Sequence, residues 1–193
     1  MLRSGDRVLI RPIRPGDKAG LQDGLHQLTL ESRYRRFFAP MRELSARQLR
    51  YLTEVDHRTH EALVAIDLDS AKGIGVARFI RSTTDRTAAE AAVAVVDDWQ
   101  GRGLGTALLK ALAARAREEG VERFTASVLA GNSPMLELVR RLSDTAVIDG
   151  TGTVAEVQVR LRRRGMPAAL SHAIRLAAGG EVEVEPRHPA APS

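Results

Sequence analysis

The sequence predicts a single α/β domain built on one mixed sheet. Three apolar, strand-like segments follow one another at residues 60–67, 73–80 and 88–96, separated by polar turns. An amphipathic segment at 104–119 and another strand-like segment at 123–129 come next. The closely spaced strands favour antiparallel pairing, and the strand-helix-strand unit that follows makes the sheet mixed.

The N-terminal part is expected to supply one strand and two helices. Residues 8–13 are predicted to form the first strand, closed by the turn and helix-start residues 15–17 (PGD). Residues 18–33 have helical propensity, and Ser45 opens a second helix that ends near Leu52. The residues available for burial around this second helix are Leu44, Leu49 and Leu52.

The clearest helix in the chain is 104–119. Leu104, Leu108, Leu112 and Arg115 fall on one stripe of this helix. Gly120 stands where a C-terminal cap is expected, because glycine adopts the left-handed conformation without steric cost. The stripe predicts that this helix packs against the sheet.

The C-terminal part predicts a helix at 133–142 and a closing pair of strands at 146–148 and 153–161. After residue 164 the chain is rich in alanine, proline and glycine. We therefore expect one domain over residues 1–164 and a poorly ordered tail over 165–193.

Composition narrows the class of protein. The 193 residues are 44% hydrophobic and 27% charged, which is ordinary for a globular domain. The chain has no cysteine, so a disulfide framework and a cysteine-ligated metal are excluded. No segment approaches the roughly 20 apolar residues of a membrane span. We expect a cytoplasmic protein without a membrane partner, and no carboxylate and histidine spacing suggests a metal site.

The formal net charge of +5 raises the question of a nucleic-acid partner. Residues 159–193 hold six arginines and three glutamates, which leaves the other 158 residues with a net charge of only +2. A nearly balanced body does not form the broad basic surface that nucleic acids require. We expect no nucleic-acid partner.

Residues 97–106, DDWQGRGLGT, contain three glycines on alternate positions ahead of the clearest helix. The segment has no lysine of a Walker loop, and neither glycine register matches G-x-G-x-x-G. What remains is a glycine-rich turn whose unobstructed N–H groups face an anion at a helix N-terminus. A flexible strand-to-helix turn is the alternative.

The spacing Gln100-x-x-Gly103-x-Gly105 matches the pyrophosphate motif Q/R-x-x-G-x-G/A, and VAVVDDWQGRGLGTALLKALAARAREEG resembles the core motif of the GNAT superfamily of N-acetyltransferases. Within that superfamily, SRYRRFF and residues 44–65 are similar to the acetyltransferase domain of bacterial Pat-type protein-lysine acetyltransferases. The resemblance implies a central, mostly antiparallel mixed sheet of six to seven strands, flanked by about four helices and splayed between the fourth and fifth strands.

The resemblance also implies acetyl-CoA as cosubstrate and a set of positions that hold it. The backbone at Val95 binds the pantetheine arm and orients the acetyl carbonyl, and Gln100 lies at the entrance to the cradle. Asn132 matches an asparagine that bonds the pantetheine, although it also fits a helix N-cap. The full set is Val95, Val96, Gln100, Gly101, Arg102, Gly103, Leu104, Gly105, Thr106 and Asn132.

The chemistry requires a proton acceptor, because a lysine amine with a pKa of about 10.4 is protonated at neutral pH. Glu90 is the only acidic residue within the apolar segment 88–96, and partial burial there favours a raised pKa. Five residues before Val95 is also where glutamate-dependent GNAT enzymes carry their base. A solvated glutamate at the sheet edge is the alternative, and Asp97 and Asp98 are better suited to a turn or cap.

Other polar residues give weaker indications. His57 and His60 could line the substrate entrance or relay a proton, or they could be structural. Arginines at 33, 35 and 36 could contact the phosphates of the cofactor or a protein substrate. Val139 occupies the position where many GNAT enzymes carry a tyrosine acid, so a tyrosine there is excluded.

We expect an acetyl-CoA-dependent N-acetyltransferase that acts on protein lysine by direct amine attack in a ternary complex, with Glu90 as base. A small-molecule amine acetyltransferase and a non-catalytic acetyl-CoA-binding sensor are the alternatives. The state expected in solution is a monomer or a homodimer.

Overall fold

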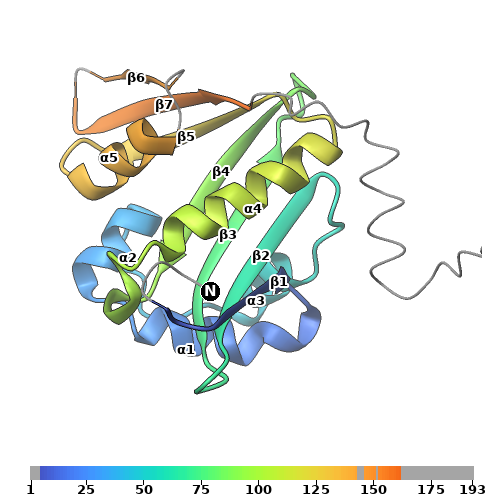
Figure 1. Ribbon diagram of the computed structural model, residues 1–193, viewed down its shortest axis with the longest axis vertical. Helices are drawn as coiled ribbons and strands as arrows, with labels where there is room; N and C mark the ends of the chain where they lie inside the picture. Colours follow the sequence, from blue (N-terminus) through green and yellow to red (C-terminus); the bar gives the residue numbers. More distant parts are fainter. Residues whose placement is uncertain (1–4, 143–145, 151, 162–193) are drawn as a thin grey trace, which may run out of the picture. The chain divides into compact units, whose positions relative to one another are not determined.

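Seven strands of the described residues form one mixed sheet in the computed structural model of the chain (Figure 1). The structure describes residues 5–142, 146–150 and 152–161, so the predicted tail, 165–193, lies outside the described residues. The sheet order is β1-β2-β3-β4-β5-β7-β6, and every neighbouring pair is antiparallel except β4 with β5. The strands are β1 (Val8–Pro12), β2 (His60–Asp67), β3 (Gly73–Arg81), β4 (Ala88–Val95), β5 (Arg123–Leu129), β6 (Val147–Asp149) and β7 (Val154–Arg160).

The described residues form five α-helices and two short 3-10 helices. The α-helices are α1 (Lys18–His26), α2 (Leu30–Phe37), α3 (Ala46–Thr53), α4 (Leu104–Glu118) and α5 (Ser133–Leu142), and the 3-10 helices are Pro15–Asp17 and Asp97–Trp99. The strand and helix predictions agree with these bounds closely, with one exception in the N-terminal part.

The single helix predicted over residues 18–33 is wrong, because the chain breaks there into α1 and α2. Thr29 is extended and its side chain accepts a hydrogen bond from Ser32 N, so it caps α2. The helical propensity of the segment is continuous, but a threonine that can cap offers the backbone a competing local bond. The break gives α2 a direction of its own.

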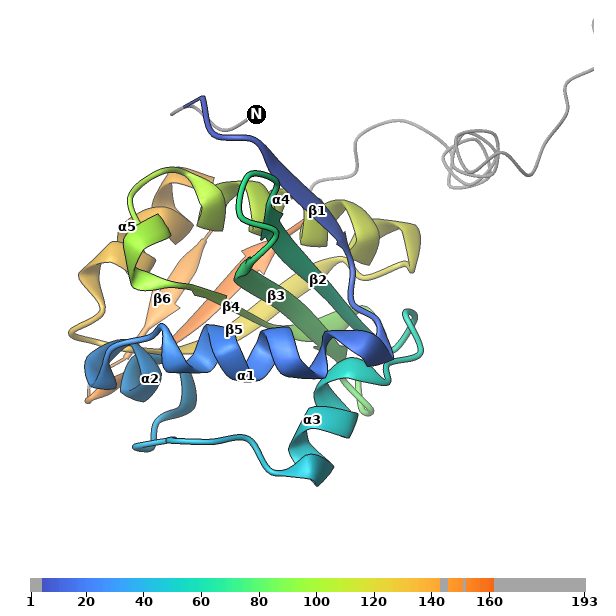
Figure 2. The ribbon, with the colours of Figure 1, turned by 90° about the horizontal axis from the view of Figure 1, so that it is seen from below.

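The two faces of the sheet carry different helices (Figures 1 and 2). On one face α4 contacts β2, β3 and β4, and Leu104, Leu108 and Leu112 are fully buried there, as their stripe predicts. On the other face α1 and α3 pack together around Leu25 and Leu44. Leu49 and Leu52 join this second cluster as partly buried residues. The sheet is therefore the middle layer of three.

A close approach between α4 and β3 depends on Gly75. A Cβ at this position would lie 3.0 Å from Leu108 Cδ1 and 3.1 Å from Ala94 O. Both distances are shorter than ordinary van der Waals contacts, so a side chain at this position would have to displace Leu108 and the neighbouring strand by a few tenths of an ångström. The contact fixes α4 beside the C-terminal end of β4.

The parallel pairing of β4 with β5 is short. It joins residues 88–90 to residues 123–125 and extends no further, so the two strands part beyond Glu90. The splay predicted between the fourth and fifth strands is confirmed. Val96 N donates to Ile74 O of β3 (3.1 Å), and because strand backbone groups alternate, the N–H and C=O of Val95 face the side of β5.

A buried ion cluster fastens α4 to β2. Glu61 is fully buried and accepts from Arg115 Nε at 2.8 Å, while His57 Nδ1 lies 2.7 Å from its other oxygen. Arg115 also donates to Glu118 at 2.6 Å. The carboxylate and the guanidinium thus have well-matched partners, which is how a buried charge is normally accommodated.

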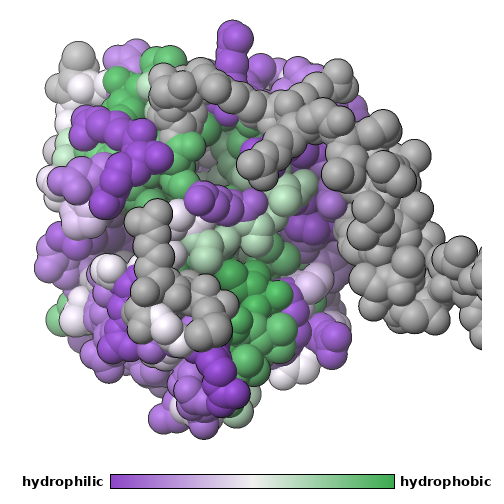
Figure 3. Space-filling view, in the orientation of Figure 1, coloured by the Kyte–Doolittle hydropathy of each residue, from purple (hydrophilic) through white to green (hydrophobic). Residues whose placement is uncertain are grey.

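The outer surface over α4 carries both hydrophilic and hydrophobic residues, and the strongest hydrophobic colour gathers near β1 and near α5 (Figure 3). α5 packs on β5 and β7 through the buried residues Val128, Val139 and Val157. Within the part of the chain that the structure describes, no helix is long and apolar enough to cross a membrane.

Candidate functional site

The turn between β4 and α4 has a backbone that only glycine adopts easily. Gly101 has φ of 74° and Gly103 has φ of 87°, both in the left-handed region. Gly103 is the N-cap of α4 and has no side chain to cap the first amides. The first helical hydrogen bond here runs from Ala107 N to Gly103 O (3.0 Å), so the amides of 104–106 precede the ladder. Such amides, at the positive end of the helix dipole, suit a phosphate.

Polar bonds anchor the start of this turn. Asp97 accepts from Thr29 N and from Ser32 Oγ, each at 2.5 Å, and from Gln100 Nε2 at 2.7 Å. Burial acts to raise the pKa of Asp97, but the bonds from Ser32, Thr29 and Gln100 outweigh it and hold that pKa below its usual range. Asp97 is therefore a structural anchor, as its turn position predicts, and it ties the loop to the start of α2.

Gln100 lies where the loop meets the open edge of β4. Its Nε2 donates to Val95 O at 3.1 Å as well as to Asp97. The side chain therefore bonds the carbonyl that the splay exposes. An incoming amide donor would compete with Gln100 for this carbonyl.

The side chain of Arg102 lies outside the turn. Its guanidinium is 5.0 Å from the centre of the Trp99 ring and 3.7 Å from a carboxylate oxygen of Asp6. The backbone of Arg102 belongs to the turn, whereas its charge is used on Trp99 and Asp6. The contribution of this residue to the turn is thus an amide rather than a guanidinium.

Asn132 precedes α5 and acts at its N-terminus. Its backbone carbonyl accepts from Met135 N and Leu136 N, both at 3.1 Å, and its Oδ1 has a longer contact of 3.4 Å with Met135 N. Asn132 therefore occupies the position of an N-cap at the start of α5. Because the side-chain contact is long, the amide side chain is not tied strongly to the helix.

Glu90 lines a cavity of about 340 Å³ on the face opposite α4. Arg36, Tyr51 and Arg78 line the same cavity, and Glu90 lies opposite Ile80 in the β3–β4 register. The strand is partly buried, but the Glu90 side chain is exposed. The partial burial predicted for this carboxylate is therefore wrong, and the cavity instead leaves it open to an approaching molecule.

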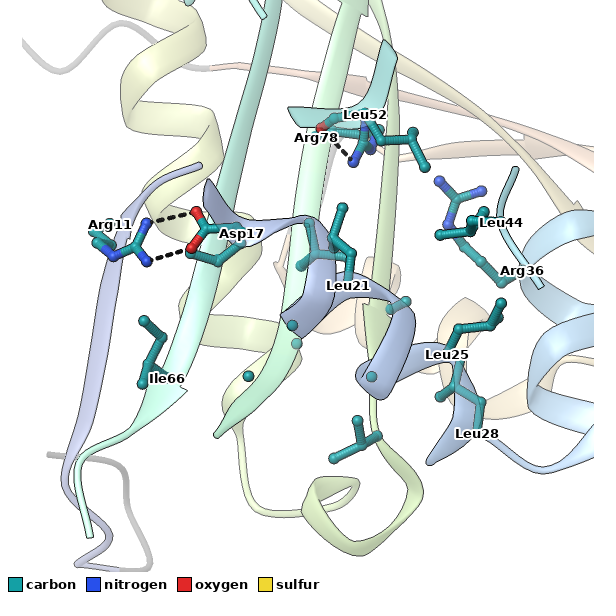
Figure 4. Close-up of a pocket in the computed structure, with 18 of the residues that line it drawn as sticks. Arg11, Asp17, Leu21, Leu25, Leu28, Arg36, Leu44, Leu52, Ile66 and Arg78 are labelled. Carbon is teal, nitrogen blue, oxygen red and sulfur yellow. Dashed lines mark hydrogen bonds and ion pairs between the residues drawn. The ribbon is translucent and has the colours of Figure 1, made fainter. Parts of the chain in front are cut away.

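A second cavity, of about 250 Å³, lies between α1 and the sheet (Figure 4). Leu21, Leu25 and Leu28 line it from the side of α1, and Ala94 and Val96 extend it to the C-terminal end of β4. At one end Arg11 donates to both carboxylate oxygens of Asp17, at 2.8 and 2.6 Å. That bidentate bond holds the pKa of Asp17 below its usual range.

Both cavities are lined by Arg36 and Arg78, so they meet at these two side chains. The two cavities together cover one face of β4, from Val96 to Glu90. The other arginines of α2 are engaged elsewhere: Arg33 donates to Leu28 O at 2.9 Å, and Arg35 pairs with Glu31. Of the three arginines that the sequence indicated, Arg36 alone lines the cavity of Glu90.

The two histidines point to different partners. His57 bonds the buried Glu61, which places it in the cluster that fastens α4. His60 instead contacts Arg78, with 3.1 Å between His60 Nε2 and Arg78 Nη1, and its ring centre is 5.1 Å from that of Tyr51. The structure therefore favours a structural role for His57, whereas His60 contacts two residues, Arg78 and Tyr51, that line the cavity of Glu90.

Arg78 is the residue of this site that the sequence interpretation missed. Its signal was present, because it is the only charged residue within the apolar run GIGVARFI. The structure buries it to 5% exposure in the centre of β3. Among the described residues, no group of three or more histidine and acidic side chains could hold a metal ion.

Comparison with known proteins identifies the family. The family model described as acetyltransferase (GNAT) family matches residues 24–143. The acetyltransferase Pat of Mycolicibacterium smegmatis is 38% identical over 159 residues, which is 82% of this chain and 47% of that protein. The chain thus spans about half the length of this relative.

Two solved structures show the same fold. The GNAT domain of PAT from S. lividans superposes with a TM-score of 0.76 and 32% identity, covering 82% of this chain and 93% of that domain. The structure of yncA from Salmonella typhimurium, solved with its cofactor acetyl-CoA, has a TM-score of 0.65 and 18% identity, covering 83% of this chain and 97% of that one. The predicted fold class is confirmed.

We predict that the imidazole of His60 titrates far below neutral pH. Burial lowers the pKa of His60 from 6.5 to about 4, and the charge of Arg78 adds to this effect. The unfolded chain therefore takes up a proton that the folded chain refuses, so stability from neutral His60 is complete above pH 6.5 and is lost as the pH falls toward 4.

An NMR titration of the His60 ring, assigned with a His60→Gln variant, measures this pKa. A midpoint near pH 4 supports the described burial of the ring beside Arg78. A midpoint near 6.5 would show that the ring is solvated, which contradicts its burial beside Arg78.

Proposed function

The chain belongs to the GNAT family of acetyltransferases, and we propose that it transfers the acetyl group of acetyl-CoA to the side-chain amine of protein lysine. The observation that carries the proposal is the glycine turn at residues 101–106, which lies directly beside the open edge of β4. Acetyl-CoA carries a diphosphate, which suits the glycine turn, and an extended amide-bearing arm, which suits the open strand edge. Binding of both groups requires these two features to lie side by side.

The described residues fit acetyl-CoA. The amides of 101–106 and the dipole of α4 suit the pyrophosphate, because a left-handed Gly101 and Gly103 leave no side chain in the way. The backbone of Val95 faces the splay and suits the amides of the pantetheine arm, with Val96 next to it in the chain. Asn132, between the end of β5 and α5, is the other residue that we assign to this arm. Gln100 lies at the entrance, where it bonds Val95 O.

Protein lysine as the acceptor is supported by similarity. Residues 44–65 resemble Pat-type protein-lysine acetyltransferases, and the Pat protein of M. smegmatis is 38% identical over 159 residues. In the structure this segment contains α3, from which Tyr51 lines the cavity of Glu90. The segment that resembles Pat-type enzymes thus forms part of the proposed acceptor site.

The mechanism we propose is direct transfer. Acetyl-CoA supplies the activated carbonyl to which the amine adds. Glu90 takes the proton of the amine, and the backbone at Val95 orients the carbonyl that is attacked. No cysteine is present to carry an acyl group on the protein. Val139 is buried and has no proton to give, so the thiolate takes its proton from solvent or from another group.

A small-molecule amine is the second acceptor we consider. The cavities of about 250 and 340 Å³ that meet at Arg36 and Arg78 have the size of a small-ligand site. A screen of radiolabelled acetyl-CoA against cell lysate and a panel of amines separates the two classes. Label on lysine residues of proteins supports our proposal, and label on small molecules alone would refute it.

We predict that Glu90→Gln leaves acetyl-CoA binding unchanged and lowers turnover by roughly 10²- to 10⁴-fold at neutral pH, the usual contribution of a general base. Turnover of the variant should rise with pH toward the pKa of the amine, because a deprotonated amine needs no base. Binding is measured by calorimetry and turnover by product formation. Unchanged turnover in the variant would remove Glu90 from the mechanism. Absence of turnover by the unsubstituted protein with any acceptor would favour an acetyl-CoA sensor.

We predict that Gly103→Ala weakens acetyl-CoA binding more than Gly120→Ala does. Both glycines have positive φ, of 87° and 79°, and a Cβ at either meets no atom within 4 Å. Each variant should therefore lose a similar stability, about 1–2 kcal/mol. Only Gly103 lies in the proposed cradle, whereas Gly120 follows the far end of α4. Calorimetric titration with acetyl-CoA measures the difference, and equal affinities would argue against the cradle.

A further inference from the structure

Arg78 is a buried cation whose contacts do not neutralise it. Its side chain is 5% exposed, Nη1 lies 3.1 Å from the Nε2 atom of His60, and Nη2 has a long contact of 3.4 Å with Leu52 O. Among residues 5–142, 146–150 and 152–161, no carboxylate lies within 4 Å of this guanidinium. A charge buried in this way ordinarily has an anionic partner.

A second guanidinium lies near it. Arg36 projects from α2 and Arg78 from β3 into the region where the two cavities meet (Figure 4). Burial and, to a smaller extent, the charge of Arg36 together lower the pKa of Arg78 to about 10, and burial also lowers the pKa of Arg36. Arg36 lies over the Phe37 ring, at 5.0 Å, and among the described residues no carboxylate lies within 4 Å of its guanidinium.

The same protein shows how a guanidinium is held when its role is structural. Arg115 donates to Glu61 at 2.8 Å and to Glu118 at 2.6 Å, and its pKa is raised despite its burial. The pKa values of Arg36 and Arg78 shift in the opposite direction, because no bonded carboxylate compensates for their burial. Their arrangement is therefore not explained by packing of the sheet.

Glu90 does not balance the pair. Arg78 lies opposite Ala92 in the β3–β4 register, so Glu90 is its diagonal neighbour, a relation that places residues about 7–8 Å apart, with their Cβ atoms somewhat closer. Glu90 lowers the cost of burying Arg36 through its charge. Among the described residues, however, no ion pair within 4 Å joins Glu90 to either guanidinium. Two cations and one anion leave the cavity with a net charge of +1, next to the proposed base.

We propose that Arg36 and Arg78 form a carboxylate-binding subsite, which holds the acceptor by an acidic group next to the amine that Glu90 deprotonates. The inference rests on the proposed function for the position of the amine. Because Arg78 and Glu90 are diagonal neighbours on adjacent strands, the bound carboxylate must lie near the amine, as in a lysine with an adjacent acidic residue. The α-carboxylate of a free amino acid offers the same chemistry from a smaller source.

The first test compares acceptors that differ in one charge. Peptides with a single lysine flanked by glutamate or by glutamine supply one pair, and free lysine with lysine amide supplies the other. We expect kcat/KM to be at least tenfold higher for the carboxylate member of one pair, as for a charge-assisted bond in a shielded site. A preference in the peptide pair identifies an acidic residue next to lysine as the source of the carboxylate, and a preference in the lysine pair identifies the α-carboxylate of a free amino acid. Equal kcat/KM values within both pairs would overturn the proposal.

Variants assign the preference to the two arginines. Arg36→Gln and Arg78→Met should each reduce the preference to less than about threefold, mainly by lowering activity on the carboxylate acceptor. The matched control is Arg86→Gln, an exposed arginine in the turn between β3 and β4, which should keep the full preference. If Arg78→Met does not fold, Arg36→Gln decides, and a preference that survives in it contradicts the subsite.

A binding measurement separates this inference from the proposed function. Glutarate and glutaramide have the same length but differ in charge, and neither needs turnover. Glutarate should shift the NMR signals of the guanidinium groups of Arg36 and Arg78, and glutaramide should not. Binding of glutarate without turnover of any acceptor would retain the subsite and refute the function, whereas turnover with no response to glutarate would do the reverse.

Discussion

The parting of β4 from β5 is the constraint on which the rest of the site depends. Their parallel pairing stops after three residue pairs, so the second half of β4 has lost its neighbour on one side. Backbone groups at such an edge need a partner, and Val95 O has found one in Gln100 Nε2 at 3.1 Å. Because the same strand continues into the glycine turn and α4, an open edge and an anion-binding helix end lie side by side.

Successive side chains of β2 point to opposite faces of the sheet and therefore make different contacts. Glu61 points toward α4, where Arg115 and His57 enclose it in a stabilising cluster. His60, one residue earlier, contacts Arg78 on the face that carries α1 and α3. The face with α4 is thus closed by apolar and ionic contacts, and the opposite face keeps the cavities. The sheet thus separates the proposed acceptor site on one face from the packing of α4 on the other.

Much of the fold could be predicted from the sequence because its signals are local. The stripe of α4, the register of the glycine turn and the strand segments each depend on a few consecutive residues, and the structure agrees with them. The break at Thr29 was missed because a capping side chain overrode a continuous helical propensity. The exposure of Glu90 and the burial of Arg78 were missed for another reason, since both depend on how far α1, α2 and α3 lie from the sheet.

We propose that the backbone of the glycine turn and of β4 holds the cofactor, and amide NMR during titration with CoA measures this contact. The amides of 101–106, assigned to the pyrophosphate, and the amide of Val95, assigned to the pantetheine arm, should show the largest changes in chemical shift. Changes that appear only at residues lining the cavity under α1, such as Leu21 and Leu25, with the turn unaffected, would contradict this assignment.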